Sequence, residues 1–158
     1  MNTINAIKFL SEGTSTISLI KVSDPADYNV SLEYSYNGND WSVWDLSGLT
    51  VNSGDTLFIR GNNPSGFNSY NKDTKTYKYY RFMIKGDEVS CSGNIMSLID
   101  YENLPDTIPC GICFYGLFEN CSFLTSAPEL PATTLVDHCY SFMFSGCTFL
   151  KDKKWFEF

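Results

Sequence analysis

Long apolar runs are missing from this sequence. Residues 1–22 contain no basic stretch followed by an apolar core, as a secretory signal peptide would, and no later segment approaches the length that spans a bilayer. We therefore expect no membrane insertion and no export signal in the chain. Such a protein either has lost a leader or reaches its site of action by another route, such as assembly into a particle inside the cell.

Side chains that usually carry catalysis are also scarce. His138 is the single histidine, and the sequence has neither a phosphate-binding glycine loop nor a Gly-x-Ser-x-Gly nucleophile motif. Cys110 and Cys113 have the spacing of half a zinc site, but no second pair stands at ligand spacing apart from the repeated cysteines described below. The acidic residues lack the regular spacing of a calcium loop. These absences predict a non-enzymatic protein without a cofactor or a metal.

Basic residues are fewer than acidic ones. The chain has 11 Lys and Arg residues against 18 Asp and Glu, a formal net charge of −7, so phosphate backbones and anionic lipid surfaces would be repelled. We therefore expect no nucleic-acid partner. With 43% hydrophobic and 18% charged residues the composition is globular, and an aromatic share of 16% favours strands over helices. A chain of 158 residues can bury a core as one domain or as two small ones.

Six cysteines are present, an even number that in a small chain often indicates a disulfide framework. Their positions favour another interpretation. Cys113 and Cys139 are 26 residues apart, and so are Cys121 and Cys147, as expected when each copy of a repeat needs a small apolar residue at the same place. Because a chain without a leader would fold in a reducing compartment, we predict that the cysteines are buried free thiols.

The same 26-residue offset relates two whole segments. The segment CFYGLFENCSFL (113–124) matches CYSFMFSGCTFL (139–150), and a weaker copy starts at Asn94. Four positions define the structural repeat, and the matched residues are Cys113, Phe118, Cys121 and Leu124 in the first copy and Cys139, Phe144, Cys147 and Leu150 in the second. Recurrence at a constant interval predicts units that stack, because one unit alone cannot bury its apolar face.

Within each unit we expect a turn of helix followed by a short strand. Cys139, Met143 and Phe144 would form the apolar face of the helix, with Gly146 as its left-handed terminator. Alternation at the end of the unit predicts the strand, which a proline turn would end. The tail KDKKWFEF (151–158) breaks the pattern, and its aromatic residues would cap the last unit; a docking peptide for a partner is the alternative.

The stretch FENCSFLTSAPELPATTLVDHCYSFMFSGCTFL resembles the BspA-like leucine-rich repeats found in surface proteins of gut and oral bacteria and in some other mucosal organisms. In that pattern an aromatic residue, a Gly or Asn, a Cys, a Ser or Thr and a Leu precede a short strand and a Leu-Pro turn. The resemblance covers residues 94–150 and implies a leucine-rich-repeat stack in a surface protein. The family usually has many copies, whereas this chain has two good ones, so the stack would be a compact platform.

The first 90 residues predict antiparallel β structure. Apolar and polar residues alternate in segments 6–10, 15–22, 30–36, 55–61 and 78–86. The Asn37-Gly38 pair indicates a hairpin with a type I′ turn, whose two central residues need positive φ. We predict a mainly β protein, with an antiparallel β-sandwich of immunoglobulin-like size over residues 1–90 and the leucine-rich-repeat stack over 91–158. The pattern YSYNGNDWSVWDL followed by SGDTLFIRG also resembles the β module that often precedes these repeats in gut bacterial proteins.

Two hypotheses for function follow. The first is an interaction protein that binds a protein or glycan surface, as an adhesion module of a bacterial surface or a decoration module of a phage that infects such bacteria. It would lie at the cell surface if a leader has been removed, and otherwise in the virion or the cytoplasm. The alternative is a carbohydrate-binding module that uses Trp41 and Trp44 near the hairpin, because aromatic faces with a polar edge suit flat ligands; burial of both in the core is the simpler interpretation.

The polar loop 61–76 offers further candidates. It is long and rich in turn-forming residues, so we expect it to project from the sandwich, and loops of this kind often carry function. Phe67 and Tyr70 are the aromatic residues of this loop that are hardest to account for as residues of the hydrophobic core. Sheet edges and exposed aromatic residues could also pair with another copy, which leaves a homo-oligomer open.

Overall fold

The computed structural model describes residues 4–22 and 30–151. Within these ranges eleven strands and one 3₁₀ helix, η1 (Ile95–Leu98), follow one another, and there is no α-helix. The strands are β1 (Ile7–Ser11), β2 (Thr14–Lys21), β3 (Leu32–Ser35), β4 (Ser42–Val43), β5 (Leu49–Asn52), β6 (Leu57–Gly61), β7 (Ser69–Asn71), β8 (Thr76–Lys78), β9 (Tyr80–Gly86), β10 (Val89–Gly93) and β11 (Leu124–Ser126). Of the tail 151–158 that was predicted to cap the last unit, residues 152–158, with all its aromatic residues, lie outside the described residues.

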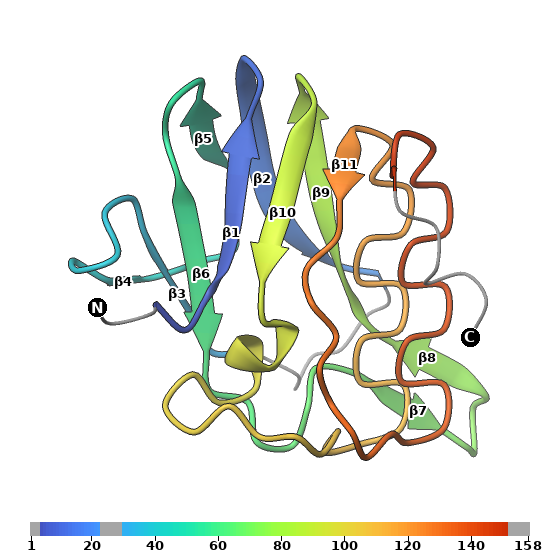
Figure 1. The fold of residues 1–158 in the computed structure, drawn as a ribbon. Coiled ribbons are helices and arrows are strands. Elements are labelled where there is room, and N and C mark those ends of the chain that lie inside the picture. Colours follow the sequence, from blue (N-terminus) through green and yellow to red (C-terminus); the bar gives the residue numbers. More distant parts are fainter. Residues whose placement is uncertain (1–3, 23–29, 152–158) are drawn as a thin grey trace.

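The strands form two main sheets, which confirms the prediction of a mainly β protein (Figure 1). One sheet has six strands in the order β11-β10-β1-β6-β3-β4, and the other has three in the order β5-β2-β9. β10 and β11 are parallel, whereas the other paired strands are antiparallel. β7 and β8 form a separate hairpin. In Figure 1 the C-terminal segments, in orange and red, run beside β11, β10 and β9.

Side chains of both sheets face a common core. In β2 the buried residues Ser15, Ile17 and Leu19 alternate with more exposed ones, because successive side chains of a strand point to opposite faces. Phe9 of the six-stranded sheet contacts Phe82 of the three-stranded sheet, with ring centroids 5.3 Å apart. Each of the five segments predicted from alternation overlaps most of one observed strand.

The six-stranded sheet continues across the predicted domain boundary between residues 90 and 91. That boundary falls within β10, which pairs with β1 on one side and with β11 on the other. All four residues of η1, which follows β10, are buried. The C-terminal part of the chain is therefore joined to the N-terminal part by the hydrogen bonds of one sheet.

The β3–β4 hairpin forms, but without the predicted type I′ turn. The loop between the strands is longer than two residues, and of the central pair Gly38 has positive φ, at +77°, whereas Asn37 does not. The Oδ1 of Asn37 instead accepts hydrogen bonds from the backbone N–H groups of Asn39 and Asp40. An asparagine side chain can replace a backbone turn in this way, so the local sequence makes a different turn from the one predicted.

Residues 112–124 and 138–150, named coil 1 and coil 2, are runs of consecutive β-turns and not the predicted helical turns. Every second N–H group in the central part of each coil donates to the carbonyl oxygen three residues earlier. At every fourth residue φ is positive, and the matched positions are Ile112, Gly116 and Asn120 in coil 1 and His138, Phe142 and Gly146 in coil 2. Left-handed residues interrupt the repeated dihedral angles of an α-helix. This is why the apolar spacing at Cys139 and Met143 does not produce one.

Coil 1 and coil 2 are joined by a parallel ladder of hydrogen bonds. The N–H groups that do not close turns in coil 1 donate to coil 2, at 2.7–3.0 Å, from Phe114, Gly116, Phe118 and Asn120 to the carbonyl oxygens of Cys139, Ser141, Met143 and Ser145. Rings at equivalent positions stack, with centroid distances of 5.6 Å for Phe118 on Phe144, 6.1 Å for Phe114 on Tyr140 and 6.0 Å for Phe123 on Phe149. All eight residues of the structural repeat are buried. The 26-residue offset in the sequence is therefore also the offset between residues in contact.

A column of four stacked rings runs from the sheets into the coils. Trp44 stacks on Phe82 at 6.4 Å, Phe82 on Phe118 at 5.1 Å and Phe118 on Phe144 at 5.6 Å, with interplanar angles of 12–20°. The backbone N–H of Phe82 also donates to coil 1, and the thiol of Cys121 donates to the carbonyl oxygen of Phe82. Sheets and coils therefore share one hydrophobic core.

The loop 61–76 does not simply project from the sheets, as predicted. Phe67 within it is fully buried and packs against Phe114. The side-chain amide of Asn68, also buried, donates to three carbonyl oxygens of coil 1 at 3.0–3.3 Å, and its Oδ1 accepts from the N–H of Tyr80. Buried polar groups are retained when they are hydrogen-bonded in this way, so Asn68 fastens the loop to both β9 and coil 1.

Removal of the Phe118 ring tests the column. Because Phe118 is fully buried between two rings, we expect Phe118→Ala to lower the free energy of unfolding by about 3–5 kcal/mol, measured by urea denaturation. Phe123→Ala is the matched control, since that ring also stacks on its repeat counterpart but is 37% exposed. We expect the control to lose less than about 1.5 kcal/mol; equal losses would contradict a special role of the column.

Phe142 tests the left-handed positions of the coils. Its φ is +56°, its side chain is 62% exposed, and its counterpart in coil 1 is Gly116. Left-handed backbone costs a residue with a Cβ roughly 1–2 kcal/mol. Phe142→Gly should therefore be more stable than Phe142→Ala by about 1 kcal/mol, the reverse of the order in a helix or strand. Both variants remove the same ring, so a more stable alanine variant in thermal or urea unfolding would mean that position 142 is not left-handed.

Candidate functional site

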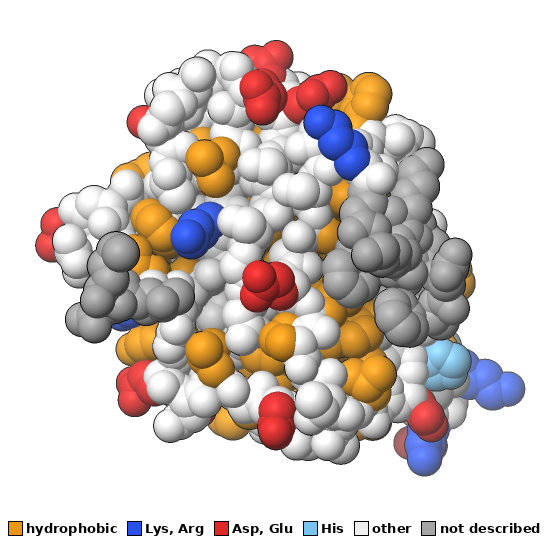
Figure 2. Space-filling view, in the orientation of Figure 1, with side chains coloured by type: hydrophobic (Ala, Val, Ile, Leu, Met, Phe, Trp, Pro, Cys, Tyr) orange, Lys and Arg blue, Asp and Glu red, His pale blue; other side chains and the backbone are white. Residues whose placement is uncertain are grey.

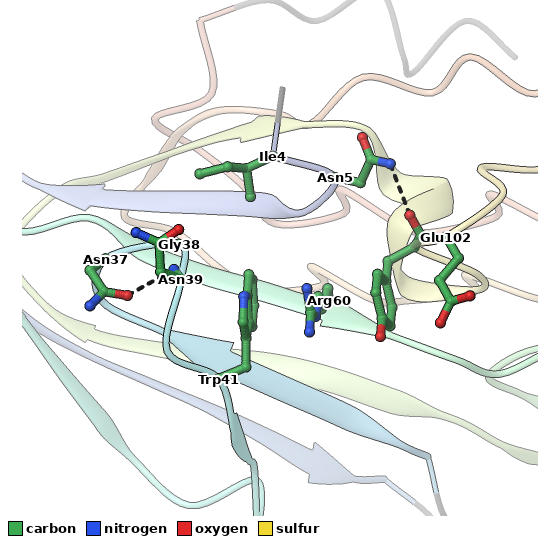
Figure 3. A pocket seen from close by; sticks show the side chains of 9 residues that line it. Ile4, Asn5, Asn37, Gly38, Asn39, Trp41, Arg60 and Glu102 are labelled. Carbon is green, nitrogen blue, oxygen red and sulfur yellow. Dashed lines mark hydrogen bonds between the residues drawn. The ribbon is translucent and has the colours of Figure 1, made fainter. Parts of the chain in front are cut away.

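A cavity of about 600 Å³, the Arg60 pocket, opens beside the β3–β4 loop (Figure 3). Its lining comes from four parts of the chain: Ile4 and Asn5, the loop residues Asn37, Gly38, Asn39 and Trp41, Arg60 of β6, and Tyr101 with Glu102 after η1. The six-stranded sheet brings these parts together, because β1, β6 and β3 are neighbours in it. The pocket therefore lies toward the β4 edge of the sheet, opposite the β11 edge beside the coils.

Arg60 is held at the centre of this pocket by stacking. Its guanidinium carbon lies 3.8 Å from the centroid of the Trp41 ring and 3.9 Å from that of the Tyr101 ring, so the planar cation sits against two aromatic faces. Its Nε donates to Glu33 Oε1 at 2.9 Å. Within the described part of the chain, its two terminal nitrogens have no hydrogen-bond partner. The guanidinium therefore keeps N–H donors available in a fixed orientation.

Two close contacts shape the wall of the Arg60 pocket. The side-chain amide of Asn5 donates to the carbonyl oxygen of Tyr101 at 2.9 Å, which ties the segment before β1 to the segment after η1. A Cβ built on Gly38 would lie 2.4 Å from Cδ1 of Ile4, so the loop approaches Ile4 this closely because position 38 is glycine. Asn39 at the rim has an exposed side chain. The wall is thus held by packing and hydrogen bonds, while its rim stays polar.

The pocket carries little net charge. Arg60 contributes one positive charge, whereas Glu33 at its Nε and Glu102 in the lining contribute one negative charge each. On the face of the molecule shown in Figure 2, acidic side chains are scattered among uncharged ones. A polyanion would find no attractive field in such surroundings, so the pocket suits a neutral or weakly charged ligand.

The four predicted binding aromatics end in different places. Trp41 lines the Arg60 pocket. Trp44 and Phe67 are corrected to core residues, because they are 4% and 0% exposed and cannot offer a ring to a ligand; Trp44 donates its Nε1 hydrogen to the carbonyl oxygen of Ser47. Tyr70 lies in β7, and its side chain is outside the described part of the structure. Only one of the four residues is therefore placed in the pocket.

Sequence reasoning missed Arg60 and Tyr101. Arg60 sits in the alternating segment 55–61, where a charged residue by itself indicates only a side chain that points away from the core. Its partners depend on the β3–β6 register, which sets Glu33 opposite Arg60, and Tyr101 comes from a segment some distance along the chain. The available signal was opposite charge on two neighbouring strands, and it becomes useful only once their pairing is known.

The remaining reactive groups are dispersed. His138 is exposed, with its Nδ1 3.2 Å from Ser141 Oγ, and nowhere in residues 4–22 and 30–151 do three His, Cys, Asp or Glu side chains gather as metal ligands would. The same ranges contain no helix long and apolar enough to cross a membrane.

Five of the six free cysteines are buried. Burial raises the pKa of Cys91 and Cys121 above the usual thiol range, and raises that of Cys147 to about 11.

The contribution of the stacked Arg60 to stability can be measured by substituting Arg60 and comparing the result with the same substitution at Arg81, which is not stacked between two rings in the described part of the chain. The two side chains are similarly buried, at 20% and 23% exposure, and each faces a carboxylate, at 2.9 Å for Glu33 and 3.9 Å for Glu119. Lysine keeps the charge but loses the planar group. In urea titrations we expect Arg60→Lys to lower the free energy of unfolding by about 1–2 kcal/mol and Arg81→Lys by less than about 0.5 kcal/mol. Equal effects would mean that the stacking contributes nothing measurable.

Comparison with known proteins gives no relative for this chain. No family model matches it, and neither does a curated protein or a solved structure. The function of the Arg60 pocket is therefore inferred from its own side chains.

Proposed function

We propose that this protein is a non-enzymatic binding module and that the Arg60 pocket binds a saccharide. The observation that carries the proposal is the guanidinium of Arg60, fixed between Trp41 and Tyr101 while its terminal nitrogens lack a partner among the described residues. A donor group that is already rigid loses little conformational entropy when a ligand binds. The pocket therefore offers oriented donors before a ligand arrives.

The other lining groups suit the chemistry of a sugar. Sugar hydroxyl groups both donate and accept hydrogen bonds, and they would find an acceptor in the carboxylate of Glu102 and both kinds of group in the exposed amide of Asn39. The C–H face of a sugar ring is apolar and suits contact with Ile4 or with the ring of Trp41. At about 600 Å³ the cavity has the size of an ordinary small-ligand site.

Charge favours a neutral saccharide over an acidic one. Glu33 already neutralises Arg60, and Glu102 adds a carboxylate to the lining. The carboxylate of an acidic sugar would lie near Glu102, and two like charges at close range repel. A neutral sugar has no such penalty, and its hydroxyl groups can use both the Arg60 donors and the Glu102 acceptor.

For the finer architecture we propose a β-sandwich joined to a short leucine-rich-repeat stack of the BspA-like kind. Support comes from the two sheets with a common core and from the coils, which contact each other at the 26-residue offset. In this proposal the coils are a rigid platform and the binding site is at the far edge of the sandwich. Such a module would be displayed at a bacterial surface or as a decoration of a phage particle.

A second candidate is a protein-binding surface on the coils. Phe142 and Phe149 of coil 2 are exposed by 62% and 48%, and Leu135, in the segment between the coils, is exposed by 53%. Exposed aromatic residues of this size are enriched at protein interfaces. This candidate places the partner at the opposite edge of the molecule from the Arg60 pocket, so the two can be separated by mutation.

Glycan binding tests the proposed function. On an array of neutral and acidic glycans we expect saturable binding to neutral ones, with the affinity then measured by isothermal titration calorimetry. Arg60→Lys retains the positive charge but loses the planar set of donors, so binding should weaken at least tenfold, equivalent to about 1.4 kcal/mol. Arg81→Lys is the matched control and should bind as the unmodified protein does.

The outcomes separate the candidates. Failure to bind any glycan contradicts the saccharide proposal. Glycan binding that survives Arg60→Lys contradicts the Arg60 pocket as the site, and its loss in the double variant Phe142→Ala, Phe149→Ala would place the glycan on the coils. Binding to acidic glycans alone contradicts the argument from charge, even if Arg60 proves essential.

A further inference from the structure

The repeat explains only one cysteine of a close pair, Cys113 in coil 1, and not its neighbour Cys110, which precedes the coil. The pair stands in the sequence Cys110-Gly111-Ile112-Cys113, and the position 26 residues after Cys110 is Val136. Cys113 is fully buried, whereas Cys110 is only half-buried, unlike the five other cysteines. Both sulfurs lie beside Gly66. An accessible thiol and a buried one thus lie close together, three residues apart in the sequence.

A glycine lies against this pair. A Cβ built on Gly66 would be 2.2 Å from the sulfur of Cys110 and 3.3 Å from that of Cys113, so both sulfurs approach a point where the chain has no side chain. The Cys110 thiol also contacts the carbonyl oxygen of Asn68 at 3.7 Å. The repeated thiols of Cys121 and Cys147 instead donate to carbonyl oxygens inside the core, at 3.2 Å and 3.0 Å. The two kinds of cysteine therefore have different surroundings.

We propose that Cys110 and Cys113 form a reversible dithiol–disulfide site, with Cys110 as the attacking thiol and Cys113 as the resolving thiol. The approach of both sulfurs to Gly66, the three-residue spacing and the unequal exposure carry this assignment. The hydrogen bond from the Cys113 thiol lowers the pKa of Cys110 to about 7 and raises that of Cys113. Cys110 is thus the thiolate, and the nucleophile, near neutral pH. The site is independent of the Arg60 pocket and of its ligand.

The reaction needs a two-electron oxidant, here a small disulfide such as oxidised glutathione. The Cys110 thiolate attacks one glutathione sulfur, so a protein–glutathione disulfide forms and one glutathione thiolate leaves with the proton that Cys110 gave up. Cys113 then gives its proton to the second glutathione thiolate as it attacks the Cys110 sulfur. Two protein thiols are oxidised to one disulfide, and one glutathione disulfide is reduced to two thiols.

The bridge would form where the loop 61–76 is fastened to coil 1. The amide of Asn68 binds the carbonyl oxygens of Ile112 and Cys113, both at 3.0 Å. A disulfide between residues 110 and 113 would hold the backbone that supplies these oxygens. On transfer from reducing to oxidising surroundings, where disulfides persist, the segment to which Asn68 binds would therefore gain a covalent cross-link, while the loop itself stays hydrogen-bonded to it.

Mass spectrometry of the whole protein tests this site. The folded protein is incubated with oxidised glutathione, its remaining thiols are alkylated under denaturing conditions, and the chain is cut after glutamate. Glu102 and Glu119 bound a peptide, 103–119, that contains Cys110 and Cys113 and no other cysteine. We expect this peptide to have lost two hydrogens and to carry no alkyl group, and to regain two reactive thiols after reduction.

Three variants assign the roles. Cys113→Ala should retain glutathione on Cys110, because the resolving thiol is absent, and Cys110→Ala should leave peptide 103–119 without glutathione. Cys139→Ala removes the neighbouring buried thiol of coil 2 and should form the bridge as the unmodified protein does. The proposal is overturned if the unmodified peptide keeps both thiols, if it retains glutathione, or if Cys110 is found joined to Cys139.

Discussion

The structure depends on one constraint, that each ring of the central column must be covered by the next. Phe118 of coil 1 covers Phe82 of the three-stranded sheet, and Phe144 of coil 2 covers Phe118. An aromatic ring left against water gives up the hydrophobic stabilisation that burial provides. Coil 1 therefore covers the core between the sheets, and coil 2 in turn covers the apolar side chains of coil 1. The ladder between the coils places side by side the same repeat positions whose rings stack in the column.

The sequence predicted the elements better than their internal geometry. Alternation placed the strands, since a side chain's face in a strand is fixed by its parity, and the 26-residue offset matched residues that are in contact. The helix predicted at Cys139 was wrong because a run of turns can also bring apolar residues four apart to one side. Glycine at positions 116 and 146 was compatible with left-handed backbone, but Ile112 and Phe142 gave no such signal, because the neighbouring coil imposes their conformation.

The candidate site was less accessible to sequence reasoning than the fold. Trp41 could be proposed because it follows a recognisable turn, yet Trp44, three residues later, faces the core and Phe67 is buried under coil 1. Arg60 and Tyr101 meet because two strands pair in one register and the segment after η1 returns to them. Local sequence encodes whether a residue lies in a strand or a turn, whereas the convergence of side chains depends on contacts between distant segments.

The ladder between the coils also limits how a chain of this kind can change in length. Left-handed positions recur every fourth residue and face their counterparts in the next coil. Deletion of one residue within 112–124 would shift every later left-handed position against its counterpart and leave N–H groups of the ladder without acceptors. Insertion of a whole 26-residue unit would preserve each pairing. The coiled part can therefore accept many substitutions of side chains, but it can grow or shrink only by complete units.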